Sequence, residues 1–180
     1  ETAIESLAEN LNDSVVAPLF WFVCLGLPGA VLYRFANTAD AMWGYRAIRE
    51  GRVWEWAGKW AARCDDVLSW VPARLTALAL MLTASCRDWR ALRAQARETP
   101  SPNSGWPMAA MALALQVRLG KPAAYVLNPQ GADATSAHLV QACRLSHQAV
   151  RWAMGAWMLG VLALGLLTQW VASSAWVAIG

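Results

Sequence analysis

The feature that most constrains this chain is its end, because residues 152–180 contain no charged side chain. About 20 consecutive apolar residues are enough for a helix to cross the hydrocarbon core of a bilayer. Arg144 and Arg151 come just before the segment. We therefore predict a final transmembrane helix over residues 152–180, and the positive-inside rule puts its arginine-rich start in the cytoplasm.

The composition of the whole chain also indicates a membrane protein. Hydrophobic residues make up 57% and charged residues 15%, and there are 12 Trp, whereas soluble domains carry about 25% charged residues. The net charge of +3 is spread along the chain, which favours a lipid bilayer rather than nucleic acid as the partner. Since the first residue is Glu1, we expect residues 1–180 to be the C-terminal part of one integral membrane domain whose N-terminal spans are missing.

Two further apolar segments predict interrupted helices. Residues 15–33 are uncharged, but Pro18, Gly26 and the pair Pro28–Gly29 interrupt them, which predicts a broken or re-entrant helix. Residues 67–84 contain Pro72, where we expect a kink. Residues 87–98 are amphipathic, and strand signals are weak. The predicted fold class is all-α: a multi-pass transmembrane helical protein with broken or re-entrant helices and interfacial amphipathic helices.

Acidic residues are spaced four apart at the start of the chain, at Glu1, Glu5, Glu9 and Asp13. On a helix this spacing places them along one face, where their charges repel. A divalent cation would remove that repulsion, and carboxylate oxygens suit Mg²⁺. The alternative is a solvated acidic face near a helix N-terminus.

Two other acidic groups also have two interpretations each. Asn37 and Asp40 share a helix face, but Asn37 could instead cap a helix with Asp40 in its first turn. Asp65 and Asp66 stand between Arg63 and Arg74. They could bind metal and phosphate together, or they could form a local ion-pair network.

A loop rich in small polar side chains follows at residues 101–106, Ser-Pro-Asn-Ser-Gly-Trp. It could hold an anion at the start of the next helix, or it could be only a turn. The cysteines and the two histidines show no zinc-site spacing.

Taken in order, these stretches resemble the CbiB/CobD family, the adenosylcobinamide-phosphate synthases of cobalamin biosynthesis. The resemblance covers roughly residues 1–125. It is carried by four groups: Glu5-Ser-Leu-Ala-Glu9-Asn10 with Asp13 and Ala17-Pro18-Leu19-Phe20; Asn37-Thr38-Ala39-Asp40-Ala41-Met42 with Gly44-Tyr45; Ala62-Arg63 with Asp65-Asp66-Val67 and Pro72-Ala73-Arg74-Leu75; and Ser101-Pro102-Asn103-Ser104-Gly105-Trp106.

The resemblance implies a multi-pass enzyme of the bacterial inner membrane. The family ligates adenosylcobyric acid, a corrinoid, to an aminoalcohol, commonly (R)-1-amino-2-propanol phosphate, by an amide bond. The reaction is associated with ATP as co-substrate and with Mg²⁺. Partners would be the bilayer, the corrinoid and aminoalcohol phosphate substrates, and either a second copy of the chain or other cobalamin-pathway enzymes.

The site predicted from the residues and the resemblance has three parts. The catalytic carboxylates are Glu5, Glu9, Asp13, Asp40, Asp65 and Asp66. Four of them are expected to bind Mg²⁺: Glu5, Glu9, Asp40 and Asp66. The substrate-binding residues are Asn10, Asn37, Tyr45, Arg63, Arg74, Ser101 and Asn103.

The sequence departs from the family pattern at Thr99, where a His is common nearby, and at Met108, where a Glu is common. Two other functions are compatible with the sequence. One is a non-catalytic sensor related to the AmpE group, and the other is a transporter, in which broken helices and intramembrane charges also occur.

Overall fold

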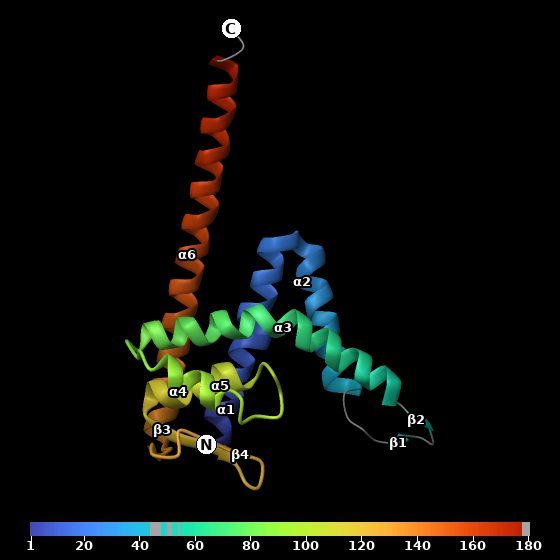
Figure 1. The fold of residues 1–180 in the computed structure, drawn as a ribbon, viewed down its shortest axis with the longest axis vertical. Helices are drawn as coiled ribbons and strands as arrows, with labels where there is room; N and C mark the ends of the chain where they lie inside the picture. The colour runs from blue at the N-terminus through green and yellow to red at the C-terminus, as the bar shows by residue number, and fades with distance from the viewer. Residues whose placement is uncertain (44–47, 50–51, 54, 178–180) are drawn as a thin grey trace.

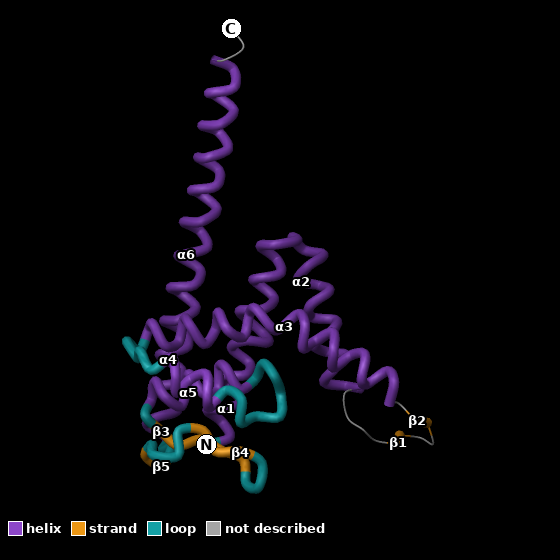
Figure 2. Tube along the Cα trace, viewed as in Figure 1, coloured by secondary structure: helices purple, strands orange, loops and turns teal. Residues whose placement is uncertain are grey.

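The computed structural model describes residues 1–43, 48–49, 52–53 and 55–177. Most of these residues are helical (Figures 1 and 2). In chain order the elements are α1 (Thr2–Leu11), the π-helix η1 (Asn12–Val16), α2 (Ala17–Trp43), β1 (Ile48–Arg49), β2 (Arg52–Val53), α3 (Glu55–Thr83), α4 (Trp89–Gln95), α5 (Gly105–Leu115), β3 (Val117–Lys121), β4 (Tyr125–Leu127), β5 (Ala132–Asp133) and α6 (Ser136–Val177).

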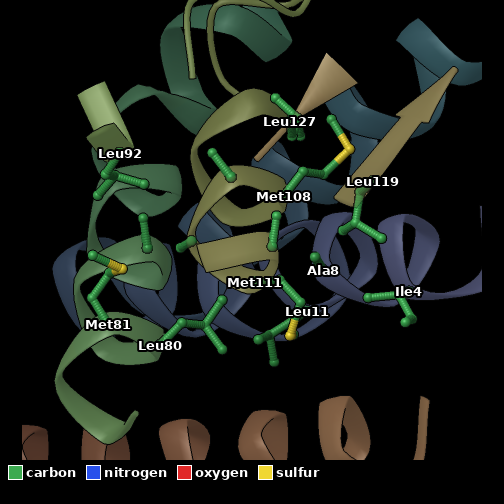
Figure 3. Close-up of a cluster of buried hydrophobic side chains, with 14 of the residues drawn as sticks. Ile4, Ala8, Leu11, Leu80, Met81, Leu92, Met108, Met111, Leu119 and Leu127 are labelled. Carbon is green, nitrogen blue, oxygen red and sulfur yellow. The ribbon is translucent and has the colours of Figure 1, made fainter. Parts of the chain in front are cut away.

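The core lies where α1, α3, α4 and α5 meet the short sheet (Figure 3). The helix α5 is its centre, because the run from Met108 to Ala112 is buried on every side. Alanines in this run let neighbouring helices approach closely, and methionine fills irregular gaps. The core ends at α6, which contributes Ala142 and Ala149.

Strands make the prediction of an all-α fold wrong in part. β3 pairs antiparallel with β4 and parallel with β5, and β1 pairs antiparallel with β2. The strands contain only two to five residues, which is too short for an alternating pattern to stand out. Val117, Leu119 and Leu127 face the core, so the sheet closes one side of it.

The chain reverses direction within α2, which is a helical hairpin (Figure 1). The break is at Gly26, whose φ of 68° and ψ of −158° are open to glycine. The prediction of a broken helix is therefore confirmed, although Pro28 and Gly29 are helical. A Cβ on Gly29 would collide with the carbonyl oxygen of Trp21 and with Leu25, so glycine lets the two arms close.

The helix α3 runs across the molecule and contacts α2, η1, α5 and α6 (Figure 1). The kink expected at Pro72 does not interrupt it, and α3 is one helix from Glu55 to Thr83. Proline has no N–H, so the carbonyl of Leu68 lacks its helical donor. The indole Nε1 of Trp21 donates to that carbonyl at 2.9 Å. The hairpin is therefore hydrogen-bonded to α3 at the Leu68 carbonyl, the backbone acceptor that Pro72 leaves without a helical donor.

The last helix and the hairpin extend in the same direction away from the core (Figure 1). α6 is helical through the segment predicted to be a final span as far as Val177, and residues 178–180 lie outside the described residues. Two other helical stretches, Thr2–Trp43 and Gly58–Thr83, are long and apolar enough to cross a membrane by length and composition. Large apolar side chains on the hairpin are exposed, among them Leu27 at 67% and Phe35 at 65%.

Candidate functional site

Four aspartates from three helices form a carboxylate cluster at the base of the hairpin. Asp13 belongs to η1, Asp40 to the returning arm of α2, and Asp65 and Asp66 to α3. The charges of the other three aspartates all act on Asp65. The predicted convergence of acidic side chains from separate helices therefore holds for these four.

The position of Asp13 is fixed by neighbouring polar side chains. Its Oδ1 accepts hydrogen bonds from Asn12 Nδ2 at 2.7 Å and from the hydroxyl of Tyr33 at 3.4 Å. The Tyr33 hydroxyl also lies 3.2 Å from Ser69 Oγ on α3. Asn12 and Asp13 lie in the π-helical turn, and such turns in α-helices are frequent at functional sites. The network ties η1, α2 and α3 together around one carboxylate.

Asn37 is a bridge rather than a helix cap. It lies inside α2, far from the start of the helix, so the capping interpretation is wrong. Its Nδ2 donates to Asp65 Oδ1 at 3.2 Å, and its Oδ1 accepts from Arg34 NH1 at 3.3 Å. The same guanidinium nitrogen donates to the backbone oxygen of Asp13 at 3.1 Å.

Asp40 and Asp66 differ from Asp13 and Asp65, each of which accepts a hydrogen bond through its Oδ1. Within the described part of the chain, neither carboxylate accepts a hydrogen bond or forms an ion pair. Both are partly buried, and their charges act on each other. An ionised carboxylate in such a place needs a donor or a cation, so these two oxygen pairs are where a ligand can bind.

The acidic stripe of α1 reaches a second, neighbouring group. Glu5 is buried, and its Oε1 accepts a hydrogen bond from the Tyr125 hydroxyl on β4 at 2.9 Å. Partial burial, this hydrogen bond and the charges of Glu5 and Glu9 raise the pKa of Tyr125 to about 12. Glu5 precedes Asp13 by two helical turns, about 12 Å of rise, so one ion cannot bind both carboxylates. Glu9 lies between them, where the charges of Glu5, Asp13 and Lys121 act on it.

Arg74 and Asn103 meet on the other side of Asp66. Arg74 NH1 donates to Asn103 Oδ1 at 3.1 Å, and Asn103 Nδ2 donates to the backbone oxygen of Asp66 at 2.7 Å. Ser101 Oγ accepts from the backbone N–H groups of Asn103 and Ser104, each at 3.2 Å. Those two N–H groups are therefore used inside the loop, and the prediction that the loop backbone holds an anion gains no support there.

The remaining predicted residues lie apart from the carboxylate cluster. Asn10 is exposed on α1. Arg63 is exposed and lines a hollow of about 880 Å³ between α2 and α3, beside Trp56 and Trp60. Tyr45 lies outside the described residues. An ion-pair network of Asp65 and Asp66 with Arg63 or Arg74 is not found among the described side chains.

The predicted magnesium ligands do not form one protein-only cage. Across residues 1–43, 48–49, 52–53 and 55–177, no three Asp, Glu, His or Cys side chains are grouped as a metal site. Magnesium is usually bound by one or two carboxylates together with water and substrate phosphates. Asp40 and Asp66 fit that pattern, whereas Glu5 is already hydrogen-bonded to Tyr125.

Several residues of the site were not found from the sequence. Tyr33 and Ser69 lie in apolar segments, where an isolated polar side chain is itself a signal. Tyr125 and Lys121 come from the short sheet, whose strands gave no pattern. Arg34, directly after the uncharged segment of residues 15–33, belongs to no motif in the sequence.

Comparisons with known proteins point to one family. A family model described as CobD/Cbib protein matches residues 1–153. A probable cobalamin biosynthesis protein CobD of Methanothermobacter thermautotrophicus is 48% identical over 150 residues, which are 80% of this chain and 49% of that protein. The cobalamin biosynthesis protein CobD of Chromobacterium violaceum is 55% identical over 123 residues, 68% of this chain and 38% of that protein.

A third relative, a probable cobalamin biosynthesis protein CobD of Pyrococcus abyssi, is 52% identical over 123 residues, 68% of this chain and 40% of that protein. The chain thus spans half or less of the length of these relatives. No solved structure matches it.

Proposed function

The chain belongs to the CobD/Cbib family of cobalamin biosynthesis, and from this membership we propose that it carries the catalytic site of an adenosylcobinamide-phosphate synthase. The reaction would be formation of an amide bond between a carboxyl group of adenosylcobyric acid and the amine of an aminoalcohol phosphate such as (R)-1-amino-2-propanol phosphate. The enzyme would be a C–N ligase.

The observation that supports this proposal best is the pair of unused carboxylates, Asp40 and Asp66, beside a fixed polar network. Asp13 and Asp65 are held by Tyr33 and Asn37, so the walls of the site are rigid. The unused oxygens can accept hydrogen bonds from the substrate amine and hold it facing the acyl group. A carboxylate there can also take up the proton that the amine loses when the amide forms.

The donor set fits magnesium bound together with a phosphorylated ligand. Asp40 and Asp66 would hold the ion, and Arg74 would pair with phosphate through the N–H groups that it does not use internally. When bound, Mg²⁺ and ATP would supply charge neutralisation and activation of the carboxyl group. Glu5 with Tyr125 would instead position α1 against the sheet.

The proposed location is the bacterial inner membrane. The first arm of the hairpin, up to Gly26, is short: residues 17–25 rise about 14 Å, roughly half of a hydrocarbon core of about 30 Å. Residues 152–177 of α6 rise about 39 Å, enough for a full span. We infer that the hairpin enters one leaflet and returns, and that α6 crosses the membrane.

The proposal is tested by incubating membranes containing the protein with adenosylcobyric acid, ATP, Mg²⁺ and aminopropanol phosphate, and measuring the amide product by mass spectrometry. Asp40→Asn and Asp66→Asn keep the shape of the side chain but remove its charge. Each should lower the rate by about a hundredfold or more. Asp133→Asn is the matched control, because Asp133 is exposed and pairs only with Arg118 on the sheet.

Two results would reject this assignment. One is wild-type activity in both aspartate variants. The other is no amide product from the wild-type protein while it binds the corrinoid, which would favour the non-catalytic sensor. A transporter would instead move the corrinoid across sealed vesicles without forming product.

A further inference from the structure

A hollow of about 590 Å³ lies between α3, α4 and the loop that leads into α5. Three arginines line it, Arg74 from α3 with Arg93 and Arg97 from the α4 region, and Ser101 stands beside them. None of the residues that line it is acidic. The hollow is separated from the carboxylate cluster by Asn103, which bonds Arg74 on one side and the Asp66 backbone on the other.

Arg74 is oriented before any ligand binds. Its guanidinium lies 4.2 Å from the ring centre of Trp70 and 4.7 Å from that of Trp106, which fixes its plane. NH1 uses its hydrogens on the Trp70 carbonyl at 2.6 Å and on Asn103 Oδ1. A guanidinium has five N–H groups, so the three on Nε and NH2 remain for a ligand.

The positive charge of this hollow is not compensated within the protein. Among the described residues, Arg74, Arg93 and Arg97 form no ion pair with an acidic side chain. Arg93 lies in α4 and Arg97 in the turn that follows it, and both side chains line the hollow. Three cations around one hollow repel each other, and a bound dianion would remove that repulsion.

We propose that this hollow is a phosphate-binding site, with Arg74, Arg93 and Arg97 as its ligands. Planar guanidinium groups match the oxygens of a phosphate monoester in pairs. The phosphate can come from a soluble phosphorylated molecule or from a lipid headgroup, since α3 carries exposed Trp56, Trp60 and Trp70 along its length. The inference shares Arg74 with the proposed function, where the same guanidinium pairs with a substrate phosphate, and direct phosphate binding tests it whether or not amide formation is found.

The test is isothermal titration calorimetry with inorganic phosphate, using the purified protein in phosphatidylcholine nanodiscs. Arg93→Gln and Arg97→Gln should each weaken phosphate binding by about tenfold or more, the loss expected for one charge-assisted hydrogen bond. Arg90→Gln is the matched control, because Arg90 is exposed on the same helix but does not line the hollow. It should bind phosphate within about twofold of wild type. Far-ultraviolet circular dichroism checks that every variant is folded.

A second experiment distinguishes a soluble phosphorylated ligand from a lipid headgroup. Nanodiscs containing phosphatidic acid, a monoester, are compared with nanodiscs of matched surface charge containing phosphatidylglycerol, a diester. If phosphatidic acid alone competes with inorganic phosphate, and the Arg93→Gln/Arg97→Gln double variant abolishes the competition, the site takes a lipid headgroup. Equal phosphate affinity in both discs supports a soluble ligand. The proposal is overturned if the double variant binds phosphate as tightly as wild type, or if Arg90→Gln loses as much affinity as Arg93→Gln.

Discussion

Replacing Trp21 by Phe should destabilise the protein mainly by leaving one backbone oxygen without a donor. The Leu68 carbonyl has no helical donor because Pro72 stands four residues later, and the Trp21 indole supplies the only hydrogen bond described for it, at 2.9 Å. An unmade hydrogen bond costs about 1–3 kcal/mol at a buried acceptor, and this partly buried one should lie toward the lower end of that range. The smaller ring adds a packing loss of about 1 kcal/mol.

The two contributions are separated by making the same change in a Pro72→Ala background. Since α3 is helical through this position, the alanine introduced there brings an N–H that can donate to the Leu68 carbonyl. Trp21→Phe should then cost only its packing loss and a second, weaker hydrogen bond. We expect the penalty to be smaller by about 1–2 kcal/mol in the Pro72→Ala background.

The measurement is a double-mutant cycle of unfolding free energies in detergent micelles, followed by far-ultraviolet circular dichroism because the variants differ in Trp. Phe22 lies one position further along the hairpin and is exposed, so Phe22→Leu controls for a general effect of changing an aromatic ring there. If Trp21→Phe costs the same in both backgrounds to within about 0.5 kcal/mol, the Leu68 carbonyl does not depend on the indole and the reasoning is wrong.

Two further outcomes are expected. Tyr125 should ionise near pH 12, later than a free tyrosine, and the tyrosinate absorbance that reports it should be lost in Tyr125→Phe. Since folding raises the pKa of Tyr125, the stability that it contributes is present below about pH 10 and declines between about pH 10 and 12. A normal tyrosine titration would contradict the Glu5 contact. In membranes, and with the other cysteines replaced by serine, Cys24 near the hairpin tip should resist a water-soluble maleimide, while Ser14→Cys and Thr38→Cys at the base should both react from the same side. Labelling of the two base positions from opposite sides would mean that the segment spans the bilayer.

The sequence predicted the parts of the fold that depend on long apolar segments and on acidic spacing. The helix of residues 152–177 and the break in the first apolar segment followed from residue type, whereas the approach of Asp13, Asp40, Asp65 and Asp66 was expected from the family resemblance. Of the interrupting residues named from the sequence, Gly26 makes the break and Pro28–Gly29 does not, because a proline in the first turn after a reversal is tolerated while a positive φ favours glycine.

What the sequence did not reveal depends on contacts between distant segments. Glu5 pairs with Tyr125, 120 positions later, and no local pattern records such a partner. Pro72 does not end α3, and Trp21, from another helix, donates to the carbonyl that the proline leaves free. In the sequence, Arg93 and Arg97 belong to an amphipathic segment with no other signal. Only the fold places them beside Arg74 around one hollow. The reaction, the metal and the membrane placement remain predictions.

The reversal at Gly26 has a consequence for how the substrates of the proposed reaction would reach the site. If the hairpin enters one leaflet and returns, as proposed, Asp13 before it and Asp40 after it would face a single aqueous compartment. Corrinoid, nucleotide and aminoalcohol phosphate are all too polar to pass through lipid, so each would arrive from, and the product would depart to, the same water. The membrane would then serve as an anchorage that holds successive pathway intermediates near one surface, without any vectorial transfer.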